Sequence, residues 1–223
     1  MRRSHLPEIV LFDLDGVLVD SRPAMISSIR AAVDSLGLDG GRLGWDDVRP
    51  LIGPPLLDGF TALLPRLGGD AALAERCVRA YRSHYAERML GGSALYPGVA
   101  TLIDGLVGQA ELLVATSKPE RFAVPLLAEL GLLDRFVAVF APELDLRRES
   151  KAQTIARALS HRPTTGRAAM IGDTLHDVVG ARSNGIPCVG VLWGFGTRDE
   201  LEAAGVDRLV TSPAELPAVL AAM

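Results

Sequence analysis

The sequence contains little that would place the protein in a membrane or outside the cell. Cysteine is scarce, and Cys77 and Cys188 fall in different predicted segments, which favours free buried thiols over a disulfide. No apolar run is long enough to span a bilayer, and the start MRRSHLPEIV lacks the apolar core of a secretory signal. These absences predict a soluble, cytoplasmic protein.

A strong charge of either sign is also lacking. The net charge is −4 and no basic patch stands out, which argues against a nucleic-acid partner, although a small anion can still find a locally positive site. No repeat or low-complexity segment is visible. What is present is an ordinary globular composition, 48% hydrophobic and 22% charged, in a chain of 223 residues that suggests one or two domains.

One segment near the start combines a strand pattern with acidic residues. Residues 9–12 are uninterrupted Ile, Val, Leu and Phe, which is typical of a strand buried on both faces of a parallel sheet. Asp13 and Asp15 follow at the end of this strand, where open α/β sheets bind ligands. Two close carboxylates need a cation or a shared proton between them, and their hard oxygen atoms suggest Mg²⁺. The alternative is that these residues and Gly16 form only a turn.

Residues 21–90 have a helical pattern and no strand signal. In the first predicted helix the apolar residues recur at helical spacing, at Ile26, Ile29, Val33 and Leu36. Further helices are predicted over 56–67 and 70–90. This helical insert predicts a second, smaller domain at 21–90, with the core formed by 1–20 and 91–223.

Helices and strands alternate in the rest of the chain, after an expected linker and turn at 91–99. Further strands are predicted over 111–116, 136–140, 168–171, 187–191 and 209–210. Helices are predicted over 99–107, 121–130, 151–159 and 178–183. This alternation predicts an α/β fold, a parallel sheet with helices on both faces.

The turn Thr116-Ser117-Lys118 follows the predicted strand at 111–116. A hydroxyl group and free backbone N–H groups at the start of a helix form a good site for phosphate oxygen atoms. The alternative is that Thr116 or Ser117 simply caps the following helix.

Lys151 stands at the start of a predicted helix. A lysine is electrostatically unfavourable there, because the helix N-terminus already carries partial positive charge. This favours an anion bound between the helix end and the ammonium group. The alternative is a solvated surface lysine.

The segment MIGDTLHD, residues 170–177, adds two more carboxylates. Asp173 ends a predicted strand, as Asp13 does, and Asp177 follows one helical turn later. The alternatives are a helix cap for Asp173 and a surface position for Asp177. We interpret His176 as a helix surface residue, since the mechanism considered below needs no imidazole.

In this order, the segments resemble the motifs of the haloacid dehalogenase superfamily. FDLDGVLVDS is similar to its first motif, in the branch that holds phosphoglycolate phosphatase-like enzymes and β-phosphoglucomutase. The resemblance covers essentially the whole chain. GVLWGFGT, residues 190–197, is also typical of this branch, and its glycines are expected in a turn beside the site. The resemblance implies a Rossmann-like core with a helical cap after the first strand.

The resemblance also implies catalytic roles. Asp13 is the expected nucleophile, and Asp15 is the expected proton donor and acceptor. Thr116, Ser117 and Lys151 are expected to bind the phosphoryl group.

The implied cofactor is Mg²⁺. Its expected ligands are Asp13, the backbone carbonyl of Asp15 and Asp173, with Asp177 as a supporting or second metal ligand. The presence of Asp15 favours phosphoryl transfer, because the dehalogenases of the superfamily lack this second Asp.

Basic residues outside the motifs have less defined roles. Arg49 precedes a Gly-Pro-Pro loop that could hold its guanidinium toward a substrate carboxylate or phosphate. The alternative is a solvated helix-end residue. Arg147 and Arg148 are less favoured substitutes for Lys151.

The predicted function is that of a Mg²⁺-dependent phosphatase, phosphoglycolate phosphatase-like, acting on a small phosphorylated metabolite through an aspartyl phosphate. A β-phosphoglucomutase-like sugar phosphate mutase would use the same residues, so this alternative stays open. An inactive phosphate-binding regulatory module is the third possibility. The expected assembly is a monomer or homodimer.

Overall fold

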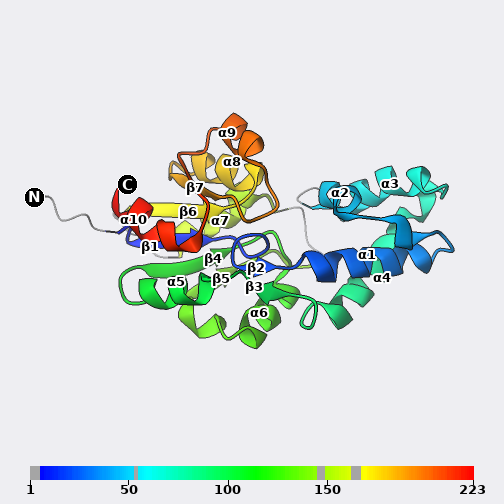
Figure 1. The fold of residues 1–223 in the computed structure, drawn as a ribbon, viewed down its shortest axis with the longest axis horizontal. Coiled ribbons are helices and arrows are strands. Elements are labelled where there is room, and N and C mark those ends of the chain that lie inside the picture. Colours follow the sequence, from blue (N-terminus) through cyan, green and yellow to red (C-terminus); the bar gives the residue numbers. More distant parts are fainter. Residues whose placement is uncertain (1–5, 53–54, 145–148, 162–166) are drawn as a thin grey trace, which may run out of the picture. The chain divides into compact units, whose positions relative to one another are not determined.

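The computed structural model describes residues 6–52, 55–144, 149–161 and 167–223 (Figure 1). The chain divides into two compact units, Met1–Asp20 with Leu95–Met223, and Ser21–Ala94. The sequence analysis places the start of the second core segment at residue 91, whereas in the structure it starts at residue 95. The later boundary falls within a two-residue strand, Ala94–Leu95, whose pattern is too short to be visible in the sequence.

The first unit is built on a six-stranded sheet with the order β5-β4-β1-β6-β7-β8, in which all described pairings are parallel. The strands are β1 (Ile9–Phe12), β4 (Glu111–Ala115), β5 (Ala138–Phe140), β6 (Ala168–Gly172), β7 (Cys188–Val191) and β8 (Arg208–Val210). β1 lies between β4 and β6, and all its residues are buried, as the apolar run predicts. Phe12 pairs with Val114 and Ile171, so the three strands end at the same edge.

Helices cover both faces of this sheet, because successive side chains of a strand point to opposite sides. Val10 and Phe12 of β1 belong to one hydrophobic core, whereas Ile9 and Leu11 belong to the other. The helices of the first core are α5 (Val99–Leu106), α6 (Glu120–Glu129) and α10 (Leu216–Ala221). The helices of the second core are α7 (Lys151–Ser160), α8 (Leu175–Ser183) and α9 (Arg198–Ala204). The predicted three-layer α/β architecture is confirmed (Figure 1).

Some elements of this unit are not predicted by the sequence pattern. β2 (Val19–Asp20) and β3 (Ala94–Leu95) form a two-stranded sheet; no element is predicted at β2, and β3 lies in the segment expected to be a linker and turn. Helices α9 and α10 are also additional. For α9 a local signal exists, since Thr197 accepts a hydrogen bond from the Glu200 N–H in a capping box.

The second unit is helical between Arg22 and Arg88 in its described residues. Its helices are α1 (Arg22–Asp34), α2 (Trp45–Val48), α3 (Leu56–Arg66) and α4 (Ala74–Arg88), with short 3₁₀ turns between them. The three predicted helices are confirmed, and α2 is additional. The core of the unit is partly aromatic, because Tyr81 stacks on Tyr85 at 5.5 Å between ring centroids and contacts Phe60 at 6.1 Å.

The structure bears on the cysteines and on membrane-spanning segments. Cys77 and Cys188 are both free and buried, as predicted. In the part of the chain that the structure describes, no helix has the length and apolarity that a membrane crossing needs.

Candidate active site

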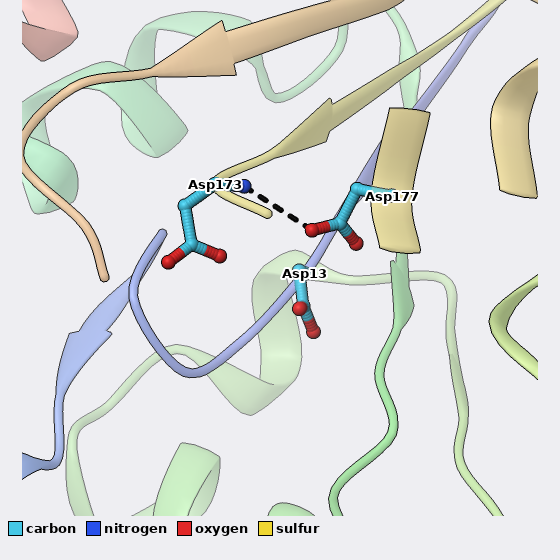
Figure 2. A group of neighbouring side chains, drawn as sticks. All are labelled: Asp13, Asp173 and Asp177. Carbon is cyan, nitrogen blue, oxygen red and sulfur yellow. Dashed lines mark hydrogen bonds between the residues drawn. The ribbon is translucent and has the colours of Figure 1, made fainter. Parts of the chain in front are cut away.

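Three carboxylates and a lysine converge at the carboxyl edge of the sheet. Asp13 directly follows β1, Asp173 directly follows β6, and Asp177 lies in the first turn of α8. Figure 2 shows these three side chains close together; each offers an oxygen atom, and these atoms lie within 4.8 Å of one another. Lys151 is the first residue of α7, a neighbour of α8 in the second core.

The Lys151 ammonium is the buried positive charge of this cluster. Its Nζ lies 2.8 Å from Asp13 Oδ2 and 2.9 Å from Asp177 Oδ1, and it donates to the Ala115 carbonyl at 3.1 Å. Burial lowers the pKa of Lys151, but the two carboxylates more than offset this, so its pKa lies above the ordinary value. The observed partners of Lys151 are carboxylates of the protein itself, and the expected binding of a phosphoryl group at this helix start stays a prediction.

Asp177 has both oxygen atoms engaged. Its Oδ2 accepts a hydrogen bond from the backbone N–H of Asp173 at 3.2 Å (Figure 2). It also accepts from the backbone N–H and the hydroxyl of Thr174, both at 3.0 Å. Its Oδ1 pairs with Lys151. These contacts fix the start of α8 and the Lys151 ammonium, which suits Asp177 to a supporting role.

Asp173 is buried in a backbone cradle that has little room. Its Oδ2 accepts from the Phe195 N–H at 2.7 Å, and a Cβ atom at Gly16, Gly194 or Gly196 would overlap Asp173. Two glycines of the segment 190–197, Gly194 and Gly196, therefore lie beside Asp173. Asp173 Oδ1 is buried and has no hydrogen-bond partner among the described residues. Burial raises the pKa of Asp173 well above its ordinary value, and Asp177 and Asp13 raise it further.

Asp13 is held at both oxygen atoms. Oδ1 accepts from the Leu14 N–H at 2.7 Å and Oδ2 pairs with Lys151. Burial raises the pKa of Asp13 from 3.8 to about 6, because the attraction of Lys151 only partly offsets the desolvation and Asp177 adds repulsion. A cation at this site would relieve that repulsion.

The group of carboxylates fits a divalent metal ion. Three hard oxygen donors lie close together, and one of them, Asp173 Oδ1, is buried without a donor, which is an unfavourable state unless a cation or proton binds there. The residues present are therefore compatible with Mg²⁺.

The predicted phosphate-binding turn has one buried and one exposed hydroxyl group. Thr116 is buried directly after β4, and its Oγ1 accepts from the Lys118 N–H at 3.1 Å, so the hydroxyl hydrogen can point to an anion. Ser117 is exposed. Neither side chain caps α6, whose N-cap residue is Pro119.

Asp15 and Lys118 form a contact that the sequence reasoning does not predict. The Lys118 Nζ lies 3.0 and 2.8 Å from the two Asp15 carboxylate oxygen atoms. The only sequence signal is that Lys118 belongs to the turn of Thr116. A second missed contact is the Trp193 Nε1–H, which donates to the Val17 carbonyl at 3.0 Å and ties the glycine-rich segment to the turn after β1.

The remaining sequence candidates are a histidine and three arginines. His176 is exposed on α8, as predicted. Arg49 opens a 3₁₀ turn, Arg49–Leu51, of the helical unit and is partly exposed. The role of Arg49 in substrate selection stays a prediction. Arg147 and Arg148 lie outside the described residues.

The fold and the site define an α/β enzyme with a carboxylate-rich centre at its carboxyl edge. The chain matches the model of the haloacid dehalogenase-like hydrolases over residues 10–191. It is 38% identical to a 5'-nucleotidase of Pseudomonas aeruginosa, over 87% of this chain and 86% of that protein. It is 33% identical to a phosphoglycolate phosphatase of Caulobacter vibrioides, over 93% of this chain and 88% of that protein. The chain belongs to the haloacid dehalogenase-like hydrolase family.

Solved structures agree with this assignment. A haloacid dehalogenase-like hydrolase of Streptococcus pneumoniae aligns with a TM-score of 0.86 at 28% identity, covering 97% of this chain and 98% of that one. Protein tyrosine kinase A of Mycobacterium tuberculosis aligns with a TM-score of 0.81 at 33% identity, covering 96% and 98%. These structures confirm the predicted fold family, and the 5'-nucleotidase and phosphoglycolate phosphatase relatives confirm the class of phosphoric monoester hydrolase.

Replacing Asp173 by asparagine should stabilise the metal-free protein while removing its response to Mg²⁺. The folded state disfavours ionised Asp173, so the stability of the wild type is highest below the unfolded pKa and falls as pH rises above about 4. The neutral amide avoids this loss and can still accept from Phe195.

The difference in free energy of unfolding between the variant and the wild type should therefore be small near pH 4 and grow to on the order of 1–3 kcal/mol near neutral pH. Denaturant unfolding with and without Mg²⁺ measures it. A variant that is less stable than the wild type at pH 8 without metal would contradict this reading, as would a wild-type-like Mg²⁺ response.

Proposed function

We propose that the protein is a Mg²⁺-dependent phosphatase that hydrolyses a small phosphomonoester through an aspartyl phosphate on Asp13. The observation that carries this proposal is the buried pair of Asp13 and Lys151 beside Asp173, whose Oδ1 has no described hydrogen-bond partner. Such a centre offers an ammonium group for phosphoryl oxygen atoms and a carboxylate for a cation.

In the first step an Asp13 oxygen atom attacks phosphorus, and the bond from phosphorus to the leaving oxygen breaks. Asp15 gives a proton to that oxygen, so the alcohol leaves neutral. The Lys151 ammonium and the Thr116 hydroxyl stabilise the charge on the transferred group. The short bond from the Leu14 N–H orients Asp13 while this happens.

In the second step Asp15 accepts a proton from water as the water oxygen attacks the phosphorus of the aspartyl phosphate. The bond between phosphorus and the Asp13 oxygen breaks, which restores the carboxylate and releases inorganic phosphate. The same two residues therefore serve both steps, and each ends the cycle in its starting protonation state.

Asp13, Asp173 and the backbone carbonyl of Asp15 would hold Mg²⁺, with Asp177 in support. When bound, the ion would offset the repulsion between a carboxylate nucleophile and a phosphate dianion. Asp177 is assigned the supporting role because its oxygen atoms already serve the start of α8 and Lys151.

A panel of phosphomonoesters tests the proposal. The relatives named above are a 5'-nucleotidase and a phosphoglycolate phosphatase, so the panel contains nucleoside 5'-monophosphates and phosphoglycolate, together with phosphotyrosine and p-nitrophenyl phosphate. Release of phosphate supports a phosphatase acting on small cytoplasmic metabolites. Conversion of β-glucose 1-phosphate without release indicates a mutase instead, and binding without turnover a regulatory module. The proposed assembly is a monomer or a homodimer, and gel filtration with light scattering would distinguish the two.

Substrate selection is assigned to the helical unit, proposed to act as a cap, and within it to Arg49. The core residues meet only the phosphoryl group, which every phosphomonoester shares, so they cannot select a leaving group. A guanidinium group suits a substrate carboxylate or a second phosphate.

Arg49→Ala should therefore lower kcat/KM on phosphoglycolate by about tenfold or more, with a much smaller effect on p-nitrophenyl phosphate, which lacks a carboxylate. Arg66→Ala, which removes an exposed ion pair with Asp47 in the same unit, is the matched control. Equal losses of kcat/KM on both esters, or no loss on either, would show that Arg49 does not recognise the leaving group.

A further inference from the structure

Lysine is rare in this chain, and its two positions are unusual. Only Lys118 and Lys151 occur among 23 basic residues; every other one is arginine. Both lysines are buried, and each pairs with a carboxylate of the segment that follows β1, Lys151 with Asp13 and Lys118 with Asp15. The mechanism above uses Lys151 and leaves Lys118 without a role.

The pair of Lys118 and Asp15 is a close, enclosed contact. The Lys118 Nζ reaches both carboxylate oxygen atoms, at 3.0 and 2.8 Å, and the two side chains are only 3% and 13% exposed. The residues are 103 positions apart in the sequence. The parallel register of β1 and β4 brings their loops together, because Phe12 pairs with Val114 near the ends of both strands.

A buried ion pair of this kind is not explained by stability alone. Desolvation of two charges offsets much of their attraction, so such pairs add little to folding compared with apolar packing. The contact does restrict orientation, since an ammonium group placed against both oxygen atoms favours one position of the Asp15 carboxylate. Lys118 is itself anchored, because its backbone N–H donates to Thr116 Oγ1 in the phosphate-binding turn.

We propose that Lys118 is a positioning residue that holds the Asp15 carboxylate for proton transfer to and from the reacting oxygen atoms. The inference rests on the proposed function and adds to it. Lys118 links Asp15 to the turn that is proposed to bind the phosphoryl group. The position of the Asp15 carboxylate relative to that turn is therefore fixed before the substrate binds. Correct placement of the catalytic group then lowers the entropy lost in the transition state.

The leaving group provides a readout that a purely structural role would not give. An alkoxide needs a proton from Asp15 to depart, whereas p-nitrophenolate is a stable anion that leaves without one. Lys118→Met should lower the rate constant for aspartyl-phosphate formation, measured in single turnovers, by about 10- to 100-fold on the best alkyl ester of the panel and by less than about threefold on p-nitrophenyl phosphate. Arg135→Met, which removes the exposed pair with Asp104, is the control and should behave as the wild type.

A double-mutant cycle covers the case in which the single variant folds poorly. Asp15→Asn combined with Lys118→Met leaves no unpaired buried charge. If Lys118 acts through Asp15, the second substitution should change the rate by less than about twofold in the Asp15→Asn background. A further loss of tenfold or more would mean that Lys118 contacts the phosphoryl group directly, and would overturn the proposal.

NMR of protein labelled at lysine Nζ tests the contact itself, since Lys118 and Lys151 give the only two such signals. Asp15→Asn should shift one signal and leave the other in place. Two unchanged signals would overturn the proposal. Lys118→Met causing equal losses in the rate of aspartyl-phosphate formation on alkyl and aryl esters, or a gain on either, would also overturn it. A folded wild type that hydrolyses no ester would overturn the proposed function as well; an active wild type with the contrary Lys118 result overturns only this inference.

Discussion

Asp13→Asn is expected to abolish phosphate release, with a loss of at least about 10³-fold in kcat, because a neutral amide is not a nucleophile toward phosphorus. No other described carboxylate can take its place. Asp173 lies in the backbone cradle, and Asp177 has its oxygen atoms bound to the start of α8 and to Lys151. Rapid acid quenching followed by intact-mass measurement should detect a phosphorylated wild type and an unphosphorylated variant.

The fold should survive this change. Asparagine has nearly the same shape, and Lys151 keeps its contacts with Asp177 and the Ala115 carbonyl. Since burial raises the pKa of Asp13 to about 6, the variant also avoids ionising a buried group as pH rises through that range. Asp104→Asn, an exposed substitution, is the matched control and should retain full activity. Substantial turnover by a folded Asp13→Asn protein whose mass excludes deamidation would reject the aspartyl-phosphate mechanism.

Removal of Mg²⁺ is expected to have an effect of similar size. Without the ion, the phosphate dianion would meet three close carboxylates, of which Lys151 pairs with two, and the repulsion would oppose binding and attack. Turnover after treatment with a chelator should be lost, and it should return on addition of Mg²⁺.

Ca²⁺ should inhibit the enzyme instead of replacing Mg²⁺. Ca²⁺ prefers more ligands and longer bonds, and could draw both oxygen atoms of Asp13 into its coordination shell, leaving none to attack phosphorus. A titration of Ca²⁺ at fixed Mg²⁺ measures this. Full activity in excess chelator, after metal removal confirmed by elemental analysis, would exclude the metal from the mechanism; activation by Ca²⁺ would exclude the proposed cause of inhibition.

The features that sequence reasoning predicts well are those set by short-range patterns. The apolar run at Ile9–Phe12 predicts a central strand because a strand buried on both faces must be apolar throughout, and β1 has this form. The alternation of helices and strands predicts the parallel sheet, and a parallel sheet brings Asp13, Thr116 and Asp173 to one edge. Short elements are less visible, since two-residue strands such as β2 contain no period to detect.

The sequence by itself therefore determined the class of fold and the sheet edge at which the candidate site residues gather. Only the tertiary structure decided which partner each charge takes. Lys151 bridges Asp13 and Asp177, whereas Lys118 pairs with Asp15, which lies 103 positions away. The strand register and the loops that follow it set these pairings. The free energy of a buried charge depends on its few nearest neighbours in space, and a local sequence pattern does not identify them.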